Sequence, residues 1–166
     1  MVFLAAVYVS AMVTANLLVF WLGPWFSPIN AFLLIGLDLT LRDVMHDRLT
    51  RLQMIGVILT GGLITWVANP TAAHIAIASA AAFSVSAAAD WFTYAKLRAK
   101  SWLVRANGSN VVGAFVDSLI FPTLAFVLLS PNPKSVAVLI PIIALQFAAK
   151  TGGGAVWAAL LSRFMK

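Results

Sequence analysis

Long apolar segments separated by short polar connections run through the whole chain, and this pattern restricts it to a membrane protein. A helix needs about 17 to 25 residues to cross a bilayer, and six segments come close to or meet this length: 2–22, 28–44, 52–68, 72–95, 110–130 and 135–162. Only 10% of the 166 residues are charged, against roughly 25% in soluble domains. We therefore expect an all-α integral membrane protein with six transmembrane helices, forming one domain over residues 1–166.

The basic residues lie in alternate connections, which predicts the orientation. With a cytoplasmic N-terminus, the outer connections hold only Lys134, and Lys150 lies in the middle of the last segment. The inner connections and tail then hold nine of the eleven Lys and Arg residues: Arg42, Arg48, Arg51, Lys96, Arg98, Lys100, Arg105, Arg163 and Lys166. Cytoplasmic loops carry such an excess. Both termini are predicted to be cytoplasmic, and the net charge of +6 reflects topology instead of a nucleic-acid-binding surface.

Local signals predict where some helices begin and end. Ser27 before Pro28 is a typical helix start, with serine as the N-cap. The turn at 68–71 predicts that segments 52–68 and 72–95 form a helical hairpin.

Asp117 is the first candidate for a functional site, because it interrupts an apolar segment. Asn110 and Gly113 share its helical face through i, i+3, i+7 spacing. A charge near the middle of a membrane helix costs roughly 2.5 to 3.5 kcal/mol on insertion scales, so such a residue usually faces a cavity or a partner.

Three more charged residues lie inside the segments: Asp38, Asp90 and Lys150. Together with Asp117 and the nearby Arg42 they form a nearly balanced set, as expected if the helices surround one polar cavity. The alternative for Asp38 and Asp90 is that they are charges near helix ends that extend to the cytoplasmic surface.

The last segment places further polar residues near Lys150. Gln146, Lys150, Gly153 or Gly154, and Trp157 recur at helical spacing, and the first segment contributes Asn16. The run of glycines at 152–154 is either a close-packing surface or a hinge beside a ligand, and packing is favoured because glycine is common where membrane helices touch.

A stripe of small residues in the first segment, Ala6, Ser10 and Thr14, is interpreted first as helix packing. Catalytic motifs for nucleotide hydrolysis, zinc or a serine nucleophile are absent from the sequence. There is no cysteine, and His46 and His74 fall on opposite sides of the membrane in this topology. We expect no metal, no cofactor and no enzymatic activity; an intramembrane enzyme would lack a nucleophile and base pair.

Four stretches resemble the bacterial queuosine precursor transporter family, also described as a vitamin uptake transporter family. They are TANLLVF (14–20), LDLTLRD (37–43), the block from ADWFTYAKLR to SWLVRANGSNVVGAFVDSLIF (89–121), and FAAKTGG (147–153). Loops and termini are short for that family. The resemblance implies uptake of 7-deazaguanine bases such as preQ0 or preQ1 across the inner (cytoplasmic) membrane. It points to these functional residues: Asp38, Asp90, Asn110, Asp117 and Lys150.

The chemistry of such a base agrees with these residue types. Adjacent N–H donors suit one carboxylate, and O6 is an acceptor that suits an amine or amide. We expect Asp117, or else Asp38 or Asp90, to bind the donor edge. Lys150 with Asn110 or Gln146 would bind the acceptor edge, and an aromatic ring would stack on the base: Trp157, Phe121 or Trp91.

Expected partners are the small nucleobase, membrane lipid and a second copy in a homodimer, with no nucleic acid. Transport would be facilitated diffusion or proton-coupled. The alternative is a substrate-binding (S) subunit of an energy-coupling-factor vitamin importer, for which the small-residue stripe would be a partner surface.

Overall fold

The computed structural model describes residues 2–46 and 48–162, and every element in them is a helix. In chain order these are α1 (Val2–Leu22), η1 (Pro24–Phe26), α2 (Ser27–Asn30), η2 (Ala31–Ile35), α3 (Gly36–His46), α4 (Arg51–Ala68), η3 (Pro70–Ala72), α5 (Ala73–Lys96), α6 (Trp102–Thr123), η4 (Leu124–Leu128) and α7 (Val136–Leu161).

Five helical stretches of the described chain are long and apolar enough to cross a membrane: Val2–Leu22, Pro24–Met45, Pro70–Lys96, Trp102–Leu128 and Val136–Leu161. The sixth apolar helix, Leu52–Ala68, is shorter. At 18 residues α4 is about 27 Å long, close to the roughly 30 Å of a bilayer core. The prediction of an all-helical, multi-pass membrane protein is confirmed, while a crossing by α4 remains a prediction.

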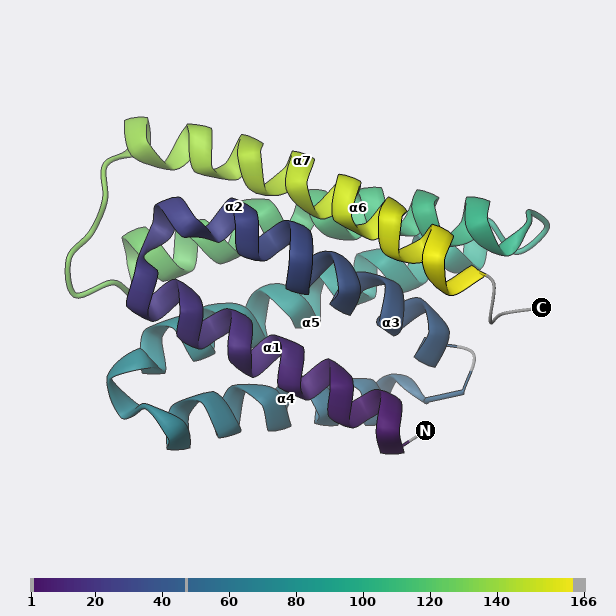
Figure 1. Cartoon of the computed structure of the whole chain (residues 1–166), viewed down its shortest axis with the longest axis horizontal. Helices are drawn as coiled ribbons and strands as arrows, with labels where there is room; N and C mark the ends of the chain where they lie inside the picture. The colour runs from purple at the N-terminus through teal and green to yellow at the C-terminus, as the bar shows by residue number, and fades with distance from the viewer. Residues whose placement is uncertain (1, 47, 163–166) are drawn as a thin grey trace.

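The chain runs back and forth along its long axis (Figure 1). The start of α1 and the end of α7 lie at the same end as the α3–α4 and α5–α6 connections. Six of the eleven basic residues lie in these connections or in the adjoining helix turns, while Lys134 lies at the other end, as the predicted topology requires. One assignment was wrong: Arg42 is not in a connection but inside the bundle, with 3% of its surface exposed. The side of the membrane that each end faces remains a prediction.

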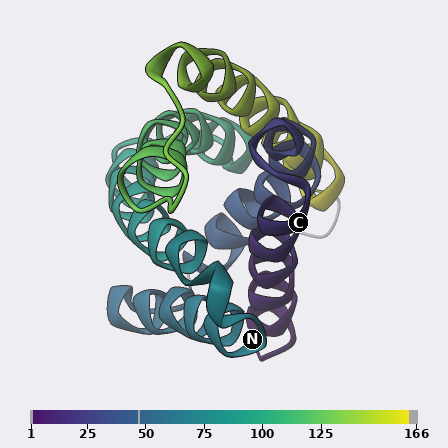
Figure 2. The ribbon, with the colours of Figure 1, turned by 90° about the vertical axis from the view of Figure 1, so that its left-hand side faces the viewer.

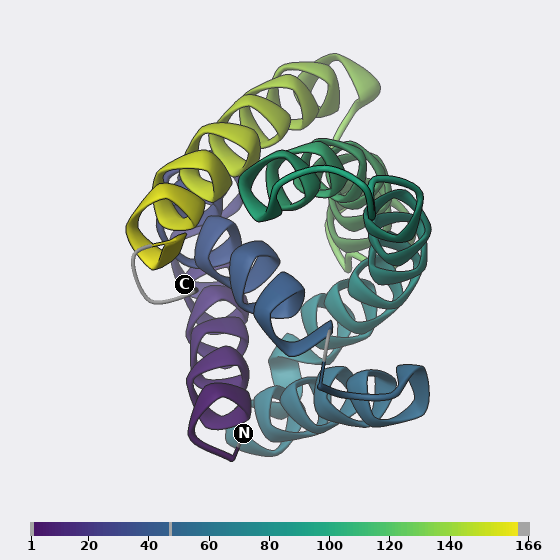
Figure 3. The same cartoon turned by 90° about the vertical axis from the view of Figure 1, so that its right-hand side faces the viewer.

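Helix α3 occupies the middle of the molecule, surrounded by the longer helices (Figures 2 and 3). Every side chain from residue 38 to 45 is buried, so this helix has no lipid-facing side. Charged residues in membrane-spanning segments usually face the bundle interior and not lipid, which explains how a stretch with the polar sequence DLTLRD lies within the membrane-spanning part of the chain.

The closest helix crossing joins α7 to the centre. A Cβ at Gly36 would lie 2.7 Å from the carbonyl carbon of Gly153, and one at Gly153 would overlap the carbonyl oxygen of Phe32. Thr40 donates a 3.2 Å hydrogen bond to the Gly154 carbonyl. Helix α7 is continuous through these glycines, which confirms the packing interpretation over the hinge.

Two local predictions have different outcomes. The helical hairpin of α4 and α5 is confirmed; its turn is capped by Asn69, which accepts a 3.2 Å bond from the Thr71 amide. Ser27 is not an N-cap, because helical structure already begins at Pro24 and no side-chain cap bond is made. Its hydroxyl instead faces the interior and accepts a hydrogen bond from Gln146.

Candidate functional site

Charged side chains fill the centre of the bundle. Four carboxylates are almost completely buried, each with at most 1% exposure: Asp38, Asp43, Asp90 and Asp117. Arg42 and Lys150 are the two buried cations of the described chain. Four acids minus two cations leaves a formal charge of −2 in the core if all are ionised. The alternative that Asp38 and Asp90 extend to the surface is therefore wrong.

Asp117 and Lys150 form the only buried ion pair among the described residues, with 2.5 Å between Nζ and Oδ2. Lys150 also donates a 2.6 Å hydrogen bond to the side-chain oxygen Oε1 of Gln146, and the side-chain amide nitrogen of Gln146 donates to the Ser27 hydroxyl. The Phe121 ring centroid lies 6.0 Å from Nζ. Helices α6 and α7 thus bring together three predicted residues and one of the predicted rings.

A small cavity of about 20 Å³ lies beside this ion pair. Asp117, Lys150, Gln146 and Phe121 line it, with Asn16 on its α1 wall. Asn16 donates a 3.1 Å bond to Thr65 of α4. A space of this size holds about one water molecule, so the site is closed in this conformation.

Asp38 and Asn110 are buried near the pair but make no hydrogen bonds within the described chain. Asp38 is close enough to both Arg42 and Asp117 to interact with them electrostatically. The Asn110 amide nitrogen lies near Gly154, 3.5 Å from where a Cβ would stand. Buried polar atoms without partners are rare and call for an explanation, and neither residue lines a cavity in this conformation.

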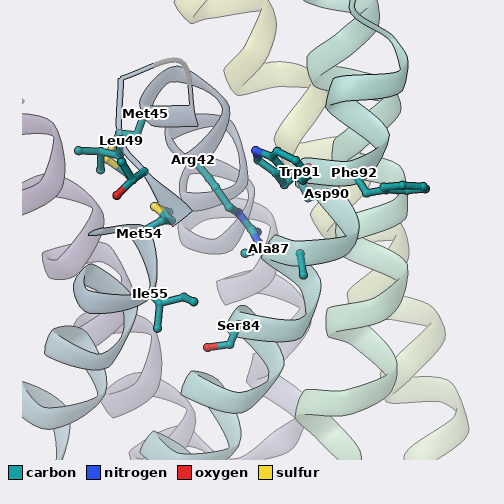
Figure 4. A pocket seen from close by; sticks show the side chains of 12 residues that line it. Arg42, Met45, Leu49, Met54, Ile55, Ser84, Ala87, Asp90, Trp91 and Phe92 are labelled. Carbon is teal, nitrogen blue, oxygen red and sulfur yellow. The ribbon is translucent and has the colours of Figure 1, made fainter. Parts of the chain in front are cut away.

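Asp90 lines a second, larger cavity of about 290 Å³ (Figure 4). It shares no lining residue with the small cavity. Arg42 of α3 and Asp90 of α5 are its charged lining residues, and Trp91 lines it as well. Arg42 donates a 3.1 Å bond to Ser86 and interacts electrostatically with Asp90. No hydrogen bond joins Asp90 to Asp117 in the described chain.

Two buried residues were missed from the sequence. Asp43 accepts a 3.2 Å hydrogen bond from Ser109 of α6. It lies inside the expected segment 28–44 but directly after Arg42, which was assigned to a connection, so it was not counted among the intramembrane charges. Tyr8 of α1 is fully buried, interacts electrostatically with Arg42 and three of the acids, and its hydroxyl has no partner in the described chain. A tyrosine in an apolar segment gives no signal of such a position.

Trp157 is not brought into the site. It lines neither cavity, and its indole donates a 3.0 Å bond to the Leu33 carbonyl in the π-helical turn η2. Its ring therefore ties α7 to η2, which leaves Phe121 and Trp91 as the predicted rings that border a cavity.

Comparison with known proteins gives one family. The sequence model of the family described as "Putative vitamin uptake transporter" matches residues 1–162. No curated protein and no solved structure matches the chain.

Proposed function

The chain belongs to the vitamin uptake transporter family, and we propose that it imports 7-deazaguanine queuosine precursors of the preQ0 and preQ1 type across the inner membrane. The family assignment supports a transporter and not an enzyme. The substrate class rests on the resemblance of the central block and on the chemistry of the buried polar residues.

The Asp117–Lys150–Gln146 row is the observation that carries this proposal. It presents a carboxylate, an ammonium and an amide side by side at the centre of the bundle, at separations of 2.5 and 2.6 Å. A deazaguanine edge has adjacent N–H donors beside a carbonyl acceptor. The carboxylate matches the donors and the ammonium or the unpartnered Asn110 amide matches the acceptor.

Binding requires the site to open, because the cavity of about 20 Å³ cannot contain a fused bicyclic base. In the closed conformation the Lys150 ammonium donates a hydrogen bond to the Oδ2 atom of Asp117. We propose that the N–H donors of the base replace Lys150 on Asp117 and that the freed ammonium binds O6. A base without a matching donor would leave the carboxylate unpaired, which supplies selectivity.

With all six buried groups ionised, the core would carry a formal charge of −2, which supports secondary transport over facilitated diffusion. An excess of buried negative charge is costly, and a proton that enters with the substrate would reduce it. Proteoliposomes loaded with a pH-sensitive dye should then acidify when the base is added outside. An unchanged internal pH during uptake would indicate facilitated diffusion.

Rescue of tRNA queuosine tests the function. Cells that neither make nor import the precursor would express the wild type, Asp117→Asn or Thr123→Val, with micromolar preQ0 or preQ1 supplied. Thr123 is a matched control because it lies on the same helix, and its hydroxyl donates a hydrogen bond to the Leu119 carbonyl within that helix. We expect rescue by the wild type and the control but not by Asp117→Asn. No rescue by the wild type would contradict the proposed substrate.

A second candidate function, the substrate-binding subunit of an energy-coupling-factor importer, has one observation in its favour. Ala6, Ser10 and Thr14 are exposed on α1, so the first interpretation of this stripe as internal packing is wrong. An exposed stripe of small residues permits close approach of another membrane helix, from a scaffold subunit or a second copy of the chain. Co-purification with a coexpressed scaffold, lost in Ser10→Leu, would favour this function; light scattering would detect a homodimer.

A further inference from the structure

We infer that the cavity between α3, α4 and α5 is a second binding station for the transported base, in which Asp90 and Arg42 bind its polar edge. This inference rests on the proposed function and adds a site on the path between the Asp117–Lys150 pair and one end of the bundle.

Size is the first argument. Binding pockets for small molecules typically have volumes of about 300 to 1,000 Å³, and this cavity of about 290 Å³ is near the lower limit. The cavity at Asp117 holds about one water molecule. In this conformation a nucleobase therefore fits at Asp90 but not at Asp117.

The second argument is the chemistry of the cavity wall. Asp90 and Arg42 interact electrostatically across the cavity lining, yet no hydrogen bond joins them in the described chain. The Arg42 guanidinium donates instead to Ser86. Neither oxygen of Asp90 accepts a hydrogen bond in the described chain. The Ser109 hydroxyl is near the Asp90 carboxylate but donates its hydrogen bond to Asp43. A carboxylate and a guanidinium held apart in this way fit a ligand that has donors and an acceptor on one edge.

Apolar surfaces complete the station. Figure 4 shows Arg42 reaching from α3 toward α5, with Met45 and Met54 beside it. Trp91 and Phe92 line the α5 side. Flat aromatic and polarisable sulfur surfaces suit the faces of a planar heterocycle.

Position connects this station to the central site. A Cβ at Gly113 would lie 3.3 Å from the Asp90 Cβ, so α5 and α6 are close at this level. Gly113 shares its face of α6 with Asn110 and Asp117. At the other side, the cavity is lined by the exposed Thr50, which precedes α4 at the end of the bundle that carries the basic connections. The station therefore lies between that end and the central pair.

Cysteine protection tests the inference, because the natural sequence has no cysteine to remove. Ser84→Cys places a thiol in the cavity wall, and Ser101→Cys places one in the exposed connection between α5 and α6 as the control. A membrane-impermeant maleimide would be applied to inside-out and right-side-out vesicles with and without preQ1. We expect Ser84→Cys to react from the side of the basic connections, with labelling slowed at least fivefold by the base. Labelling of Ser101→Cys should not change.

Asp90→Asn in the Ser84→Cys background separates binding from folding. Its labelling rate without base should match that of the parent, which shows an intact cavity, and protection by the base should be lost. Protection that persists in Asp90→Asn, or equal slowing at Ser101→Cys, would overturn the inference. Uptake by Ser84→Cys without protection overturns this station alone, whereas absence of both uptake and protection overturns the proposed function as well.

Discussion

Replacement of Lys150 by methionine should strongly destabilise the protein, because it removes the partner of a buried carboxylate. Oδ2 of Asp117 is bonded to Lys150, and Oδ1 has no hydrogen-bond partner in the described chain. The substitution also leaves the side-chain oxygen Oε1 of Gln146 without the Lys150 donor. Breaking a buried ion pair from one side costs about 3 to 5 kcal/mol. For a chain of this size, 1 kcal/mol corresponds to about 2 to 4 °C in Tm, which gives a decrease of roughly 6 to 20 °C.

The double variant Asp117→Leu/Lys150→Met distinguishes the cost of an unpaired charge from the value of the pair. Apolar residues of similar volume often replace a buried ion pair at no net cost. The double variant should therefore regain most of the stability lost by Lys150→Met, yet remain inactive in uptake. Lys134→Met is the control, since this lysine is exposed in a connection.

Thermal unfolding of purified protein in detergent, followed by tryptophan fluorescence, provides the stability measurement. Uptake of radiolabelled preQ1 into proteoliposomes provides the activity. A Tm for Lys150→Met within about 2 °C of wild type would refute the assignment of a buried pair. Uptake by the double variant would show that the pair is structural and that the base binds elsewhere.

Three further substitutions test the packing and the site. Gly153→Ala should lower Tm and abolish uptake, because the added Cβ would overlap the backbone of the helix that α7 crosses. Gly56→Ala is the control: no atom lies within 4 Å of its added Cβ, so the free energy of unfolding should stay unchanged or rise by up to about 1 kcal/mol through helix propensity. Ser109→Ala leaves a buried Asp43 oxygen without its donor and should cost about 1 to 3 kcal/mol in the same unfolding assay. Trp157→Phe loses one hydrogen bond, so the free energy of unfolding should fall by about 1 kcal/mol while the KM for uptake stays unchanged. A raised KM would place this ring at the substrate.

The sequence was sufficient to predict long apolar helices and to single out the charged positions that lie deep in apolar segments, although not which of them meet. Asp117 and Lys150 stood out because a charge in a long apolar run has few explanations, and the structure places them in contact. Their role toward a substrate remains a prediction. The glycine run at 152–154 could be assigned to packing for a similar reason, since composition alone favours close contact.

Long-range arrangement was not predictable. Whether Asp90 meets Asp117 depends on how α5 and α6 are rotated about their axes, and the spacing along each helix does not determine this rotation. The same uncertainty applied to Ala6, Ser10 and Thr14, whose stripe could face either the bundle or its surroundings. The π-helical turn η2 shifts the register between Ser27 and Asp38, and no sequence pattern indicated it.

The central position of α3 explains why the site appears in the sequence as isolated polar residues and not as a motif. Because α3 is enclosed, its polar side chains face several helices at once, and each neighbour needs only one or two polar groups to meet them. The groups that do so are Tyr8 on α1, Asp90 on α5, Ser109 and Asp117 on α6, and Lys150 on α7. A displacement of α3 relative to this ring would change the surroundings of Asp38, Arg42 and Asp43 together. On the proposed two-station path, we expect motion of this one helix to close the cavity at Asp90 and open that at Asp117.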